Sequence, residues 1–436
     1  MQQKIGKYRW TICALVFFAT TINYLDRTVI SFLKPYLAEY FHWSPVEEVA
    51  NYADIEMAFK LAYAIGFIFA GRIIDKLGTK IGYALATTVW SIAAMAHALA
   101  QSTMGLGIAR GFLGLAEAGN FPAAIKTMAE WFPKKERALA TGIFNSGSNI
   151  GAIAVPFTIP YIAETMGWQW AFILTGVVGF IWLIFWFIFY EIPKKQKRLS
   201  PEELLYINSD IDEEADLNES EPRMSWLKLL TYRQTWAFAI GKFLTDPVWW
   251  FYIFWLPDFL RKEYSLDSYA IIWPAAIPLI IASLGSVAGG WLPLRLINNG
   301  WAVFKARKTS MLIYAFLVVP IIFSQYLGQM NMWFAVVIIG LAMAGHQAWS
   351  ANIFTTVSDM FPKRCTASVT GIGGLFGSVG GLLLTWLIQK RMFVYYESIG
   401  EIQTGYYIMF FICGGAYILA WVIMHILVPK MKRVVY

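Results

Sequence analysis

The chain has 436 residues and a net charge of +7, with 58% hydrophobic residues and only 14% charged residues. Soluble domains carry about 25% charged residues, so this composition excludes an ordinary soluble protein. The positive charge does not indicate nucleic-acid binding, because Lys and Arg lie mostly in short segments between long apolar stretches, as in membrane proteins.

Twelve apolar segments follow one another along the chain, and a helix needs about 20 residues to cross the hydrocarbon core. The segments are 10–34, 49–74, 81–100, 104–130, 138–162, 169–191, 233–260, 269–293, 309–328, 331–358, 366–389 and 403–428. We therefore predict an all-α membrane protein with twelve transmembrane helices in two pseudo-symmetric six-helix bundles. The predicted parts are an N-terminal bundle at 1–192, a cytoplasmic linker at 193–232 and a C-terminal bundle at 233–436.

Lys and Arg are unevenly distributed over the loops between these segments. If the N-terminus lies in the cytoplasm, the outer side holds only Lys34, Arg261, Lys262, Lys390 and Arg391. Loops rich in Lys and Arg face the cytoplasm, so both termini are predicted there. No signal-peptide cleavage site follows the first segment, which we expect to remain in the mature protein. The cysteines form no disulfide or metal pattern.

Two arginines and two carboxylates stand out among the charged residues inside predicted spans: Asp26 and Arg27 in the first span, and Arg110 and Glu117 in the fourth. A charge at the bilayer centre costs roughly 3 kcal/mol on insertion scales and is tolerated mainly when it is paired or faces a water-filled cavity. Arg110 and Glu117 share one helix face, two turns apart. We therefore predict an internal polar cavity that binds an anion and carries protons.

An internal repeat relates the two halves of the chain. The segment from Glu130 to Gly151 matches the segment from Asp359 to Gly380 at a constant offset of 229 residues. Parallel repeats of six helices are typical of the major facilitator fold. The substrate site is then expected near the middle of the membrane, between the halves.

The loop after the second span reads Gly71-Arg72-Ile-Ile-Asp75-Lys-Leu-Gly78 and resembles the signature of the major facilitator superfamily. The glycines permit a tight turn and close packing. Asp75 is expected to pair with a basic residue or a helix N-terminus and to stabilise one conformational state. We therefore predict a gating role for Gly71, Arg72, Asp75 and Gly78.

Nearly the whole chain resembles the anion:cation symporter family, and within it the bacterial hexuronate transporters. The segments that carry this resemblance are 23–27, 78–83, 110–122, 131–137, 144–151, 243–250 and 345–348. The resemblance implies that Asp26 and Glu117 take up protons and that Arg27 and Arg110 sense the negative charge of the substrate. It also implies a location in the bacterial cytoplasmic membrane.

The predicted substrate-binding residues are Arg27, Tyr24, Asn120, Asn145, Asn149, Lys242, Trp250, His346 and Gln347. Proton coupling is predicted for Asp26, Glu117 and Arg110.

Alternative interpretations remain for several of these residues. Asp26 with Arg110, and Arg27 with Glu117, are alternatively two structural ion pairs that fix the first and fourth spans. Lys242 and Asp246 are alternatively a neutral internal pair at i,i+4. His346 is alternatively a structural hydrogen-bonding residue. Glu56 and Lys60, in the second span, are spaced to pair with each other.

These observations predict proton-coupled import of a sugar-acid anion, with a hexuronate such as glucuronate or galacturonate as the expected substrate. The alternatives are a carrier of an aldonate, aldarate or other organic anion, an exchanger or uniporter without proton coupling, and a sensor that binds the anion without transporting it. The sequence has no enzyme motif, and no cofactor is expected besides the proton as coupling ion. The expected partners are the anion, the proton and the lipid bilayer, without nucleic acid, for a monomeric protein.

Overall fold

The computed structural model describes residues 6–209, 224–266, 270, 272–384, 386, 391–393, 395–396, 399–430 and 433–434. Over this part of the chain the regular secondary structure is helical throughout. The predicted all-α class is therefore confirmed.

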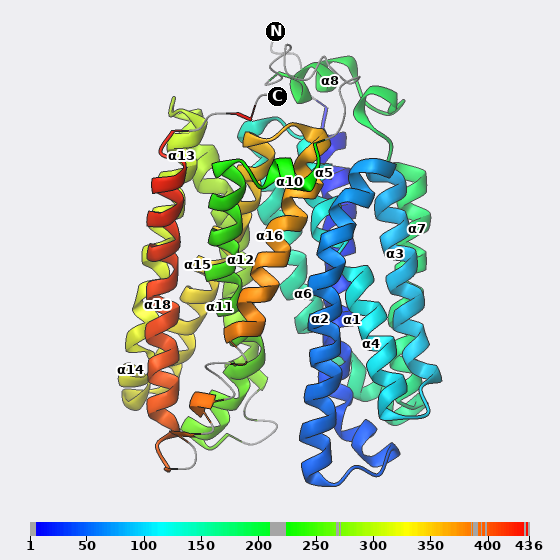
Figure 1. Cartoon of the computed structure of the whole chain (residues 1–436), viewed down its shortest axis with the longest axis vertical. Coiled ribbons are helices and arrows are strands. Elements are labelled where there is room, and N and C mark those ends of the chain that lie inside the picture. Colours follow the sequence, from blue (N-terminus) through cyan, green and yellow to red (C-terminus); the bar gives the residue numbers. More distant parts are fainter. Residues whose placement is uncertain are drawn as a thin grey trace. The chain divides into compact units, whose positions relative to one another are not determined.

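The first half forms the helices α1 (Tyr8–Tyr40), α2 (Pro45–Leu77), α3 (Thr79–Ala96), η1 (His97–Leu99), α4 (Thr103–Glu117), α5 (Asn120–Trp131), α6 (Lys134–Met166) and α7 (Trp168–Phe189). The predicted linker contains η2 (Pro193–Lys195), α8 (Pro201–Ile207) and α10 (Trp226–Leu229). The second half forms α11 (Arg233–Tyr264), α12 (Ile272–Asn298), α13 (Val303–Val318), η3 (Val319–Phe323), α14 (Ser324–Met330), α15 (Met332–Met360), α16 (Lys363–Leu384) and α18 (Ile402–Leu427). The described part of each predicted span falls on one of these helices or on a run of them (Figure 1).

Local sequence signals set several of the helix boundaries. Ser44 caps α2 in a capping box, in which its hydroxyl accepts a hydrogen bond from the Glu47 N–H and the Glu47 carboxylate accepts one from the Ser44 N–H. Gly78, with φ of 81°, separates α2 from α3, and Gly167, with φ of 96°, separates α6 from α7. Both glycines adopt a backbone conformation that is strained for other residues, which explains why the helices end there.

The predicted fourth span is not one continuous helix, because it breaks at Ala118 and Gly119 between α4 and α5. Pro122 explains the break. Its nitrogen carries no hydrogen, so the Ala118 carbonyl loses the partner that a continuous helix would provide. The proton-coupling candidate Glu117 is the last residue of α4, directly before the break.

By its contacts the chain divides into two compact units. The first contains residues 1–134, 147–224 and 361–375, and the second contains residues 135–146, 225–360 and 376–436. In the first unit α2 packs on α4, and α7 packs on α1 and α3. In the second unit α12 and α13 pack on α15, and α11 packs on α18. The predicted division at 192 and 233 follows the sequence repeat and stays a prediction.

Nine helices or helix runs of the described residues are long and apolar enough to cross a membrane. The predicted spans outside this set are α4 with α5, α6 and α11. Since α4 has 15 residues and α5 has 12, neither is long enough by itself. In α6 and α11, buried polar side chains such as Asn145, Asn149 and Lys242 interrupt the apolar sequence.

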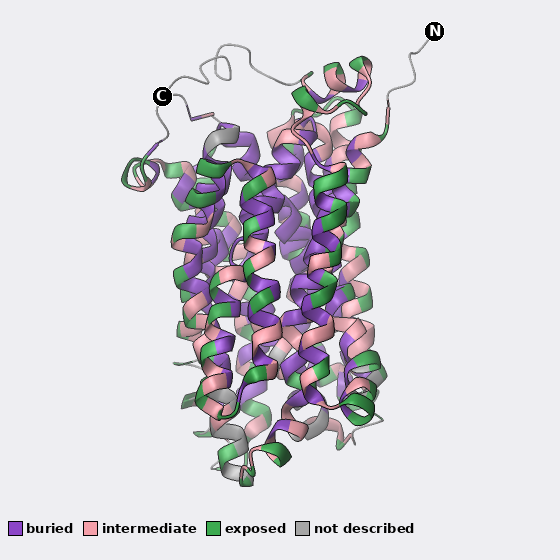
Figure 2. Ribbon diagram, turned by 90° about the vertical axis from the view of Figure 1, so that its right-hand side faces the viewer, coloured by how far each residue is buried: buried purple, intermediate pink, exposed green. Residues whose placement is uncertain are grey.

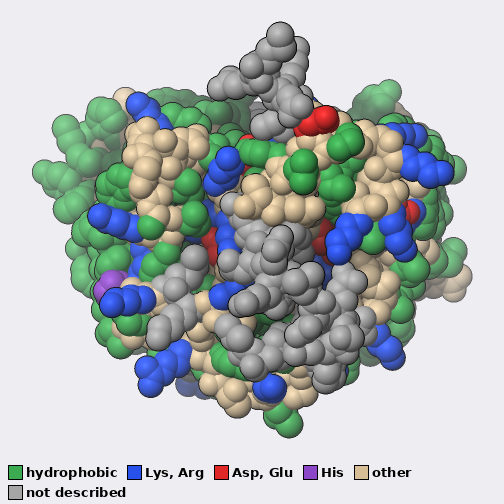
Figure 3. Space-filling view, turned by 90° about the horizontal axis from the view of Figure 1, so that it is seen from above, with side chains coloured by type: hydrophobic (Ala, Val, Ile, Leu, Met, Phe, Trp, Pro, Cys, Tyr) green, Lys and Arg blue, Asp and Glu red, His purple; other side chains and the backbone are tan. Residues whose placement is uncertain are grey.

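Exposed and buried residues alternate along the long helices, so each helix has one face toward the protein interior (Figure 2). Viewed from the end at which α8 lies, the surface carries many Lys and Arg side chains and few Asp or Glu side chains (Figure 3). An apolar outer face along each helix and a basic end are the pattern of a protein that crosses a membrane.

Candidate functional site

Arg27 is held inside the first unit by groups from three helices. Its Nε donates a hydrogen bond of 2.9 Å to Oε2 of Glu117, and its Nη2 donates one of 3.2 Å to Oδ1 of Asn23. The guanidinium lies 4.6 Å from the ring centres of both Tyr24 and Tyr63. The side chain keeps 12% of its surface exposed, whereas Glu117 is fully buried. Arg27 is thus a stacked cation paired with one titratable acid.

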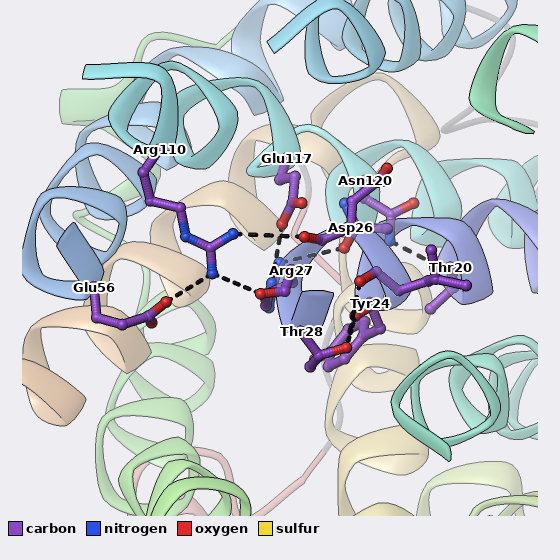
Figure 4. Close-up of polar contacts among 11 residues, drawn as sticks. Thr20, Tyr24, Asp26, Arg27, Thr28, Glu56, Arg110, Glu117 and Asn120 are labelled. Carbon is purple, nitrogen blue, oxygen red and sulfur yellow. Dashed lines mark hydrogen bonds and ion pairs between the residues drawn. The ribbon is translucent and has the colours of Figure 1, made fainter. Parts of the chain in front are cut away.

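Arg110 on α4 is 1% exposed and reaches across to α1 and α2 (Figure 4). Its Nη2 donates to Oε1 of Glu56 at 2.7 Å and to the main-chain oxygen of Arg27 at 2.6 Å. Its Nη1 lies 3.5 Å from the main-chain oxygen of Asp26. The guanidinium also lies over the Phe59 ring at 4.7 Å. Arg110 therefore fixes the α1 backbone and takes its counter-ion from α2.

Asp26 is 1% exposed, and neither carboxyl oxygen has a hydrogen-bond partner within the described part of the chain. The Thr175 hydroxyl lies nearby but donates to the Phe172 carbonyl oxygen at 3.2 Å. The structural Asp26–Arg110 ion pair considered from the sequence is not formed, because the guanidinium is engaged by Glu56 and by main-chain oxygens. Asp26 is available as a proton acceptor in this arrangement.

The remaining candidates of the first unit are also buried. Asn120 is fully buried, accepts a hydrogen bond of 2.6 Å from the Tyr83 hydroxyl and donates one of 3.5 Å to Thr20. Its amide thus joins α5 to α1 and α3. Asn149 on α6 is also fully buried. Tyr24 contacts Phe121 edge to face, in addition to stacking on Arg27.

Asp75, the central residue of the predicted gating motif, connects three helices within the first unit. Its Oδ1 accepts a hydrogen bond of 2.9 Å from Lys126 on α5. Its Oδ2 accepts two from Ser368 on α16, at 2.8 Å from the N–H and 2.6 Å from the hydroxyl. The expected basic partner is therefore present, and Ser368, a residue of the other sequence half, completes the contact.

The other gating candidates lie around Asp75. A Cβ on Gly71 would collide with the backbone of Ala367 on α16, so this contact requires glycine. Arg72 donates a hydrogen bond of 2.7 Å from Nη1 to the main-chain oxygen of Met224. Gly78 supplies the turn from α2 to α3. Together these residues tie the end of α2 to α16 and to the end of the linker.

In the second unit, Lys242 and Asp246 form an ion pair of 2.8 Å between successive turns of α11. The ammonium also lies 4.1 Å from the centre of the Phe354 ring. Trp250, one turn farther along α11, packs beside Gly381 of α16. The predicted i,i+4 pair is thus formed, and this leaves Lys242 with a neutralising partner.

His346 and Gln347 lie on α15, and both are buried. The His346 ring stacks on Trp249 at 4.8 Å with an interplanar angle of 8°, and its Nδ1 is hydrogen-bonded to the Tyr417 hydroxyl. Gln347 accepts a hydrogen bond of 2.6 Å from Asn145 on α6. The amide groups of α6 and α15 therefore meet within this unit, and the imidazole of His346 contacts α11 and α18 instead.

The sequence prediction missed the contribution of α2 to the surroundings of Arg27. Glu56, Phe59, Lys60 and Tyr63 follow one another at intervals of three, one and three residues, which places them on one helix face. This spacing is the signal that would have found them, because a stripe of charged and aromatic residues is unusual in a lipid-exposed helix. Within the described residues no group of three or more His, Cys, Asp or Glu is placed to hold a metal ion.

Comparison with known proteins identifies the family. Residues 16–385 match the Major Facilitator Superfamily. The chain is 34% identical over 389 residues to the hexuronate transporter of Escherichia coli (strain K12), with 88% of both chains covered. It is 38% identical over 291 residues to the galacturonate transporter of Dickeya chrysanthemi, covering 67% of this chain and 83% of that protein.

A solved structure of the proton:xylose symporter XylE has a similar fold. Its TM-score is 0.78 at 15% identity, over 98% of this chain and 97% of that chain. The chain therefore belongs to the major facilitator superfamily and is a membrane transporter rather than an enzyme.

Proposed function

We propose that this protein imports a sugar-acid anion together with protons, by alternating access, and that the anion is a hexuronate. Two curated relatives support the substrate class, since they are named as hexuronate and galacturonate transporters. The observation that carries the proposal is the Arg27–Glu117 pair, in which a stacked guanidinium is bound by one buried acid at 2.9 Å. Such a pair can exchange one carboxylate for another.

The exchange couples the anion to the proton. When Glu117 takes up a proton, it loses its negative charge and its ion pair with Arg27 weakens. The Arg27 guanidinium then binds the substrate carboxylate through its planar fork. Asp26 takes up a second proton and so removes a competing negative charge from the same unit. After the substrate leaves on the cytoplasmic side, both acids release their protons and Glu117 pairs with Arg27 again.

The hydroxyl groups of the sugar require further polar contacts. We propose that Asn145, Gln347 and His346 bind them, while Lys242 adds positive charge and Trp250 packs on the apolar face of the ring. A site that keeps a cation for a carboxylate rejects analogues without one, by about 10⁴-fold in favourable cases. Neutral hexoses are therefore not substrates.

The membrane orientation is part of the proposal. The basic end of the molecule, at which α8 lies, faces the cytoplasm together with both termini (Figure 3). The membrane is the bacterial inner membrane, and the monomer is the transporting form. No cofactor is required beyond the proton.

The test is uptake of labelled galacturonate into liposomes that contain the purified protein, with and without an inward proton gradient. We expect gradient-driven accumulation that excess glucuronate abolishes and excess glucose leaves unchanged. Arg27→Ala should eliminate uptake, while Arg198→Ala, a matched change in the exposed linker, should not. Uptake without any response to the gradient would refute proton coupling, and inhibition by glucose or by aldonates alone would refute the hexuronate assignment.

A further inference from the structure

Beside Asp26 and Glu117, a further acid, Glu56, is buried near Arg110, and the proposed exchange of partners between Arg27 and Glu117 gives it no role. It lies on α2 with 7% of its surface exposed. Its Oε1 accepts a hydrogen bond of 2.7 Å from Nη2 of Arg110, which is itself 1% exposed. A charged pair this deeply buried is costly to desolvate and adds little net stability, so its presence calls for a functional reason.

The position of the Arg110 guanidinium supplies that reason. It lies between Glu56 on one side and the main-chain oxygens of Asp26 and Arg27 on the other (Figure 4). It donates no hydrogen bond to the Asp26 carboxyl, although it contacts the same residue through the backbone. The Glu56 carboxylate thus holds one edge of a guanidinium whose other hydrogen bonds go to the backbone of α1.

The titratable and charged groups around Asp26 and Arg110 come from four elements. They are Tyr24 and Arg27 on α1, Glu56, Lys60 and Tyr63 on α2, His97 on η1, and Glu117 on α4. Together with Asp26 and Arg110 this set contains three acids and three Lys or Arg side chains. Glu56 and Lys60 add one negative and one positive charge, so they leave the net charge of the set unchanged. Glu56 nevertheless provides the ion-pair partner of Arg110.

We propose that Glu56 is a positioning residue that holds Arg110 away from the Asp26 carboxyl, so that Asp26 keeps the high proton affinity its coupling role requires. The inference rests on the proposed function, in which Asp26 carries a proton. A buried carboxylate without a partner is costly, so it takes up a proton readily. The same carboxylate beside an arginine is held in its ionised form by the neighbouring positive charge. Because Glu56 binds Arg110, the Asp26 carboxylate has no arginine as an ion-pair partner among the described residues.

The test is a pH titration of the purified protein in lipid nanodiscs, followed by infrared spectroscopy without any substrate. The carbonyl band of the protonated Asp26 carboxyl is identified by its loss in Asp26→Asn. In Glu56→Gln we expect the midpoint of this band to move to lower pH by about 1–3 units, because Arg110 turns to Asp26 and a nearby negative charge is lost. In Asp54→Asn, a matched loss of an exposed acid on the same helix, we expect the wild-type midpoint.

Glu56→Asp keeps the charge on a shorter side chain and should shift the midpoint less, in the same direction. It also serves as the test if Glu56→Gln does not fold. An unchanged or raised midpoint in the Glu56 variants, an equal shift in Asp54→Asn, or the absence of an Asp26 band in the wild type would each overturn the inference. Because no substrate is used, these outcomes are independent of whether the protein carries hexuronates.

Discussion

Replacing Glu117 by Gln separates proton coupling from substrate binding most directly. Glu117 is fully buried, and its Oε2 accepts the hydrogen bond of 2.9 Å from Arg27. Breaking a buried ion pair by removing one partner costs about 3–5 kcal/mol, because the other charge remains uncompensated. A bound substrate carboxylate would replace the missing charge. If it recovers only 1.4 kcal/mol of that cost, the substrate binds about tenfold more tightly to the variant than to the ionised wild type.

The same substitution should abolish accumulation. With the membrane potential held at zero, a gradient of one pH unit supports about tenfold accumulation for each proton carried with the anion. In liposomes, Glu117→Gln should exchange labelled for unlabelled galacturonate but should not concentrate it above the external level. Glu39→Gln, at the exposed end of α1, is the control and should behave as the wild type. Wild-type accumulation by Glu117→Gln, or weaker binding at neutral pH, would refute this account of coupling.

Four further substitutions test the other parts of the site. Arg27→Lys should bind galacturonate poorly in calorimetry, because an ammonium group cannot reproduce the planar fork that stacks between Tyr24 and Tyr63; unchanged affinity would place the carboxylate elsewhere. Gly71→Ala should lower the initial uptake rate severalfold, since its Cβ meets the Ala367 backbone, whereas Gly107→Ala enters open space and should leave the rate unchanged; equal rates in both would argue against the gating role. Asn145→Ala and Gln347→Ala should each raise the apparent KM about 2–10-fold, the effect of losing one neutral hydrogen bond. These two amides are hydrogen-bonded to each other, so the double variant should raise the apparent KM by less than the product of the two single increases. An increase equal to that product would indicate that the two residues act independently.

The sequence was sufficient for the helical architecture. Apolar length alone placed the helices, and the seven-residue spacing of Arg110 and Glu117 placed both on one face of α4. Asn23 and Arg27, four residues apart on α1, likewise share a helix face, and their side chains are hydrogen-bonded. Spacing within one helix is a local property, and local properties can be read from a single sequence.

The partners of these charges could not be read in the same way. Which side chain Arg110 reaches depends on how α2 and α1 pack against α4, and a helix pattern contains no information on that packing. The spacing of Glu56 and Lys60 suggested that they pair with each other, but it did not show that Glu56 binds Arg110. Likewise, Asp75 was expected to find a basic partner, but nothing local pointed to Ser368, which lies 293 residues away.

The break between α4 and α5 has a mechanical consequence. It divides one predicted span into two helices: α4, which ends at Glu117, and α5, which carries Lys126, the residue that binds Asp75. Because the Ala118 carbonyl has already lost its partner to Pro122, bending at this joint sacrifices no hydrogen bond at that position. Glu117 therefore lies directly beside a position at which the helix run already lacks one hydrogen bond. The acid that takes up the proton and the lysine that binds Asp75 thus lie on two separate helices, one on each side of this position.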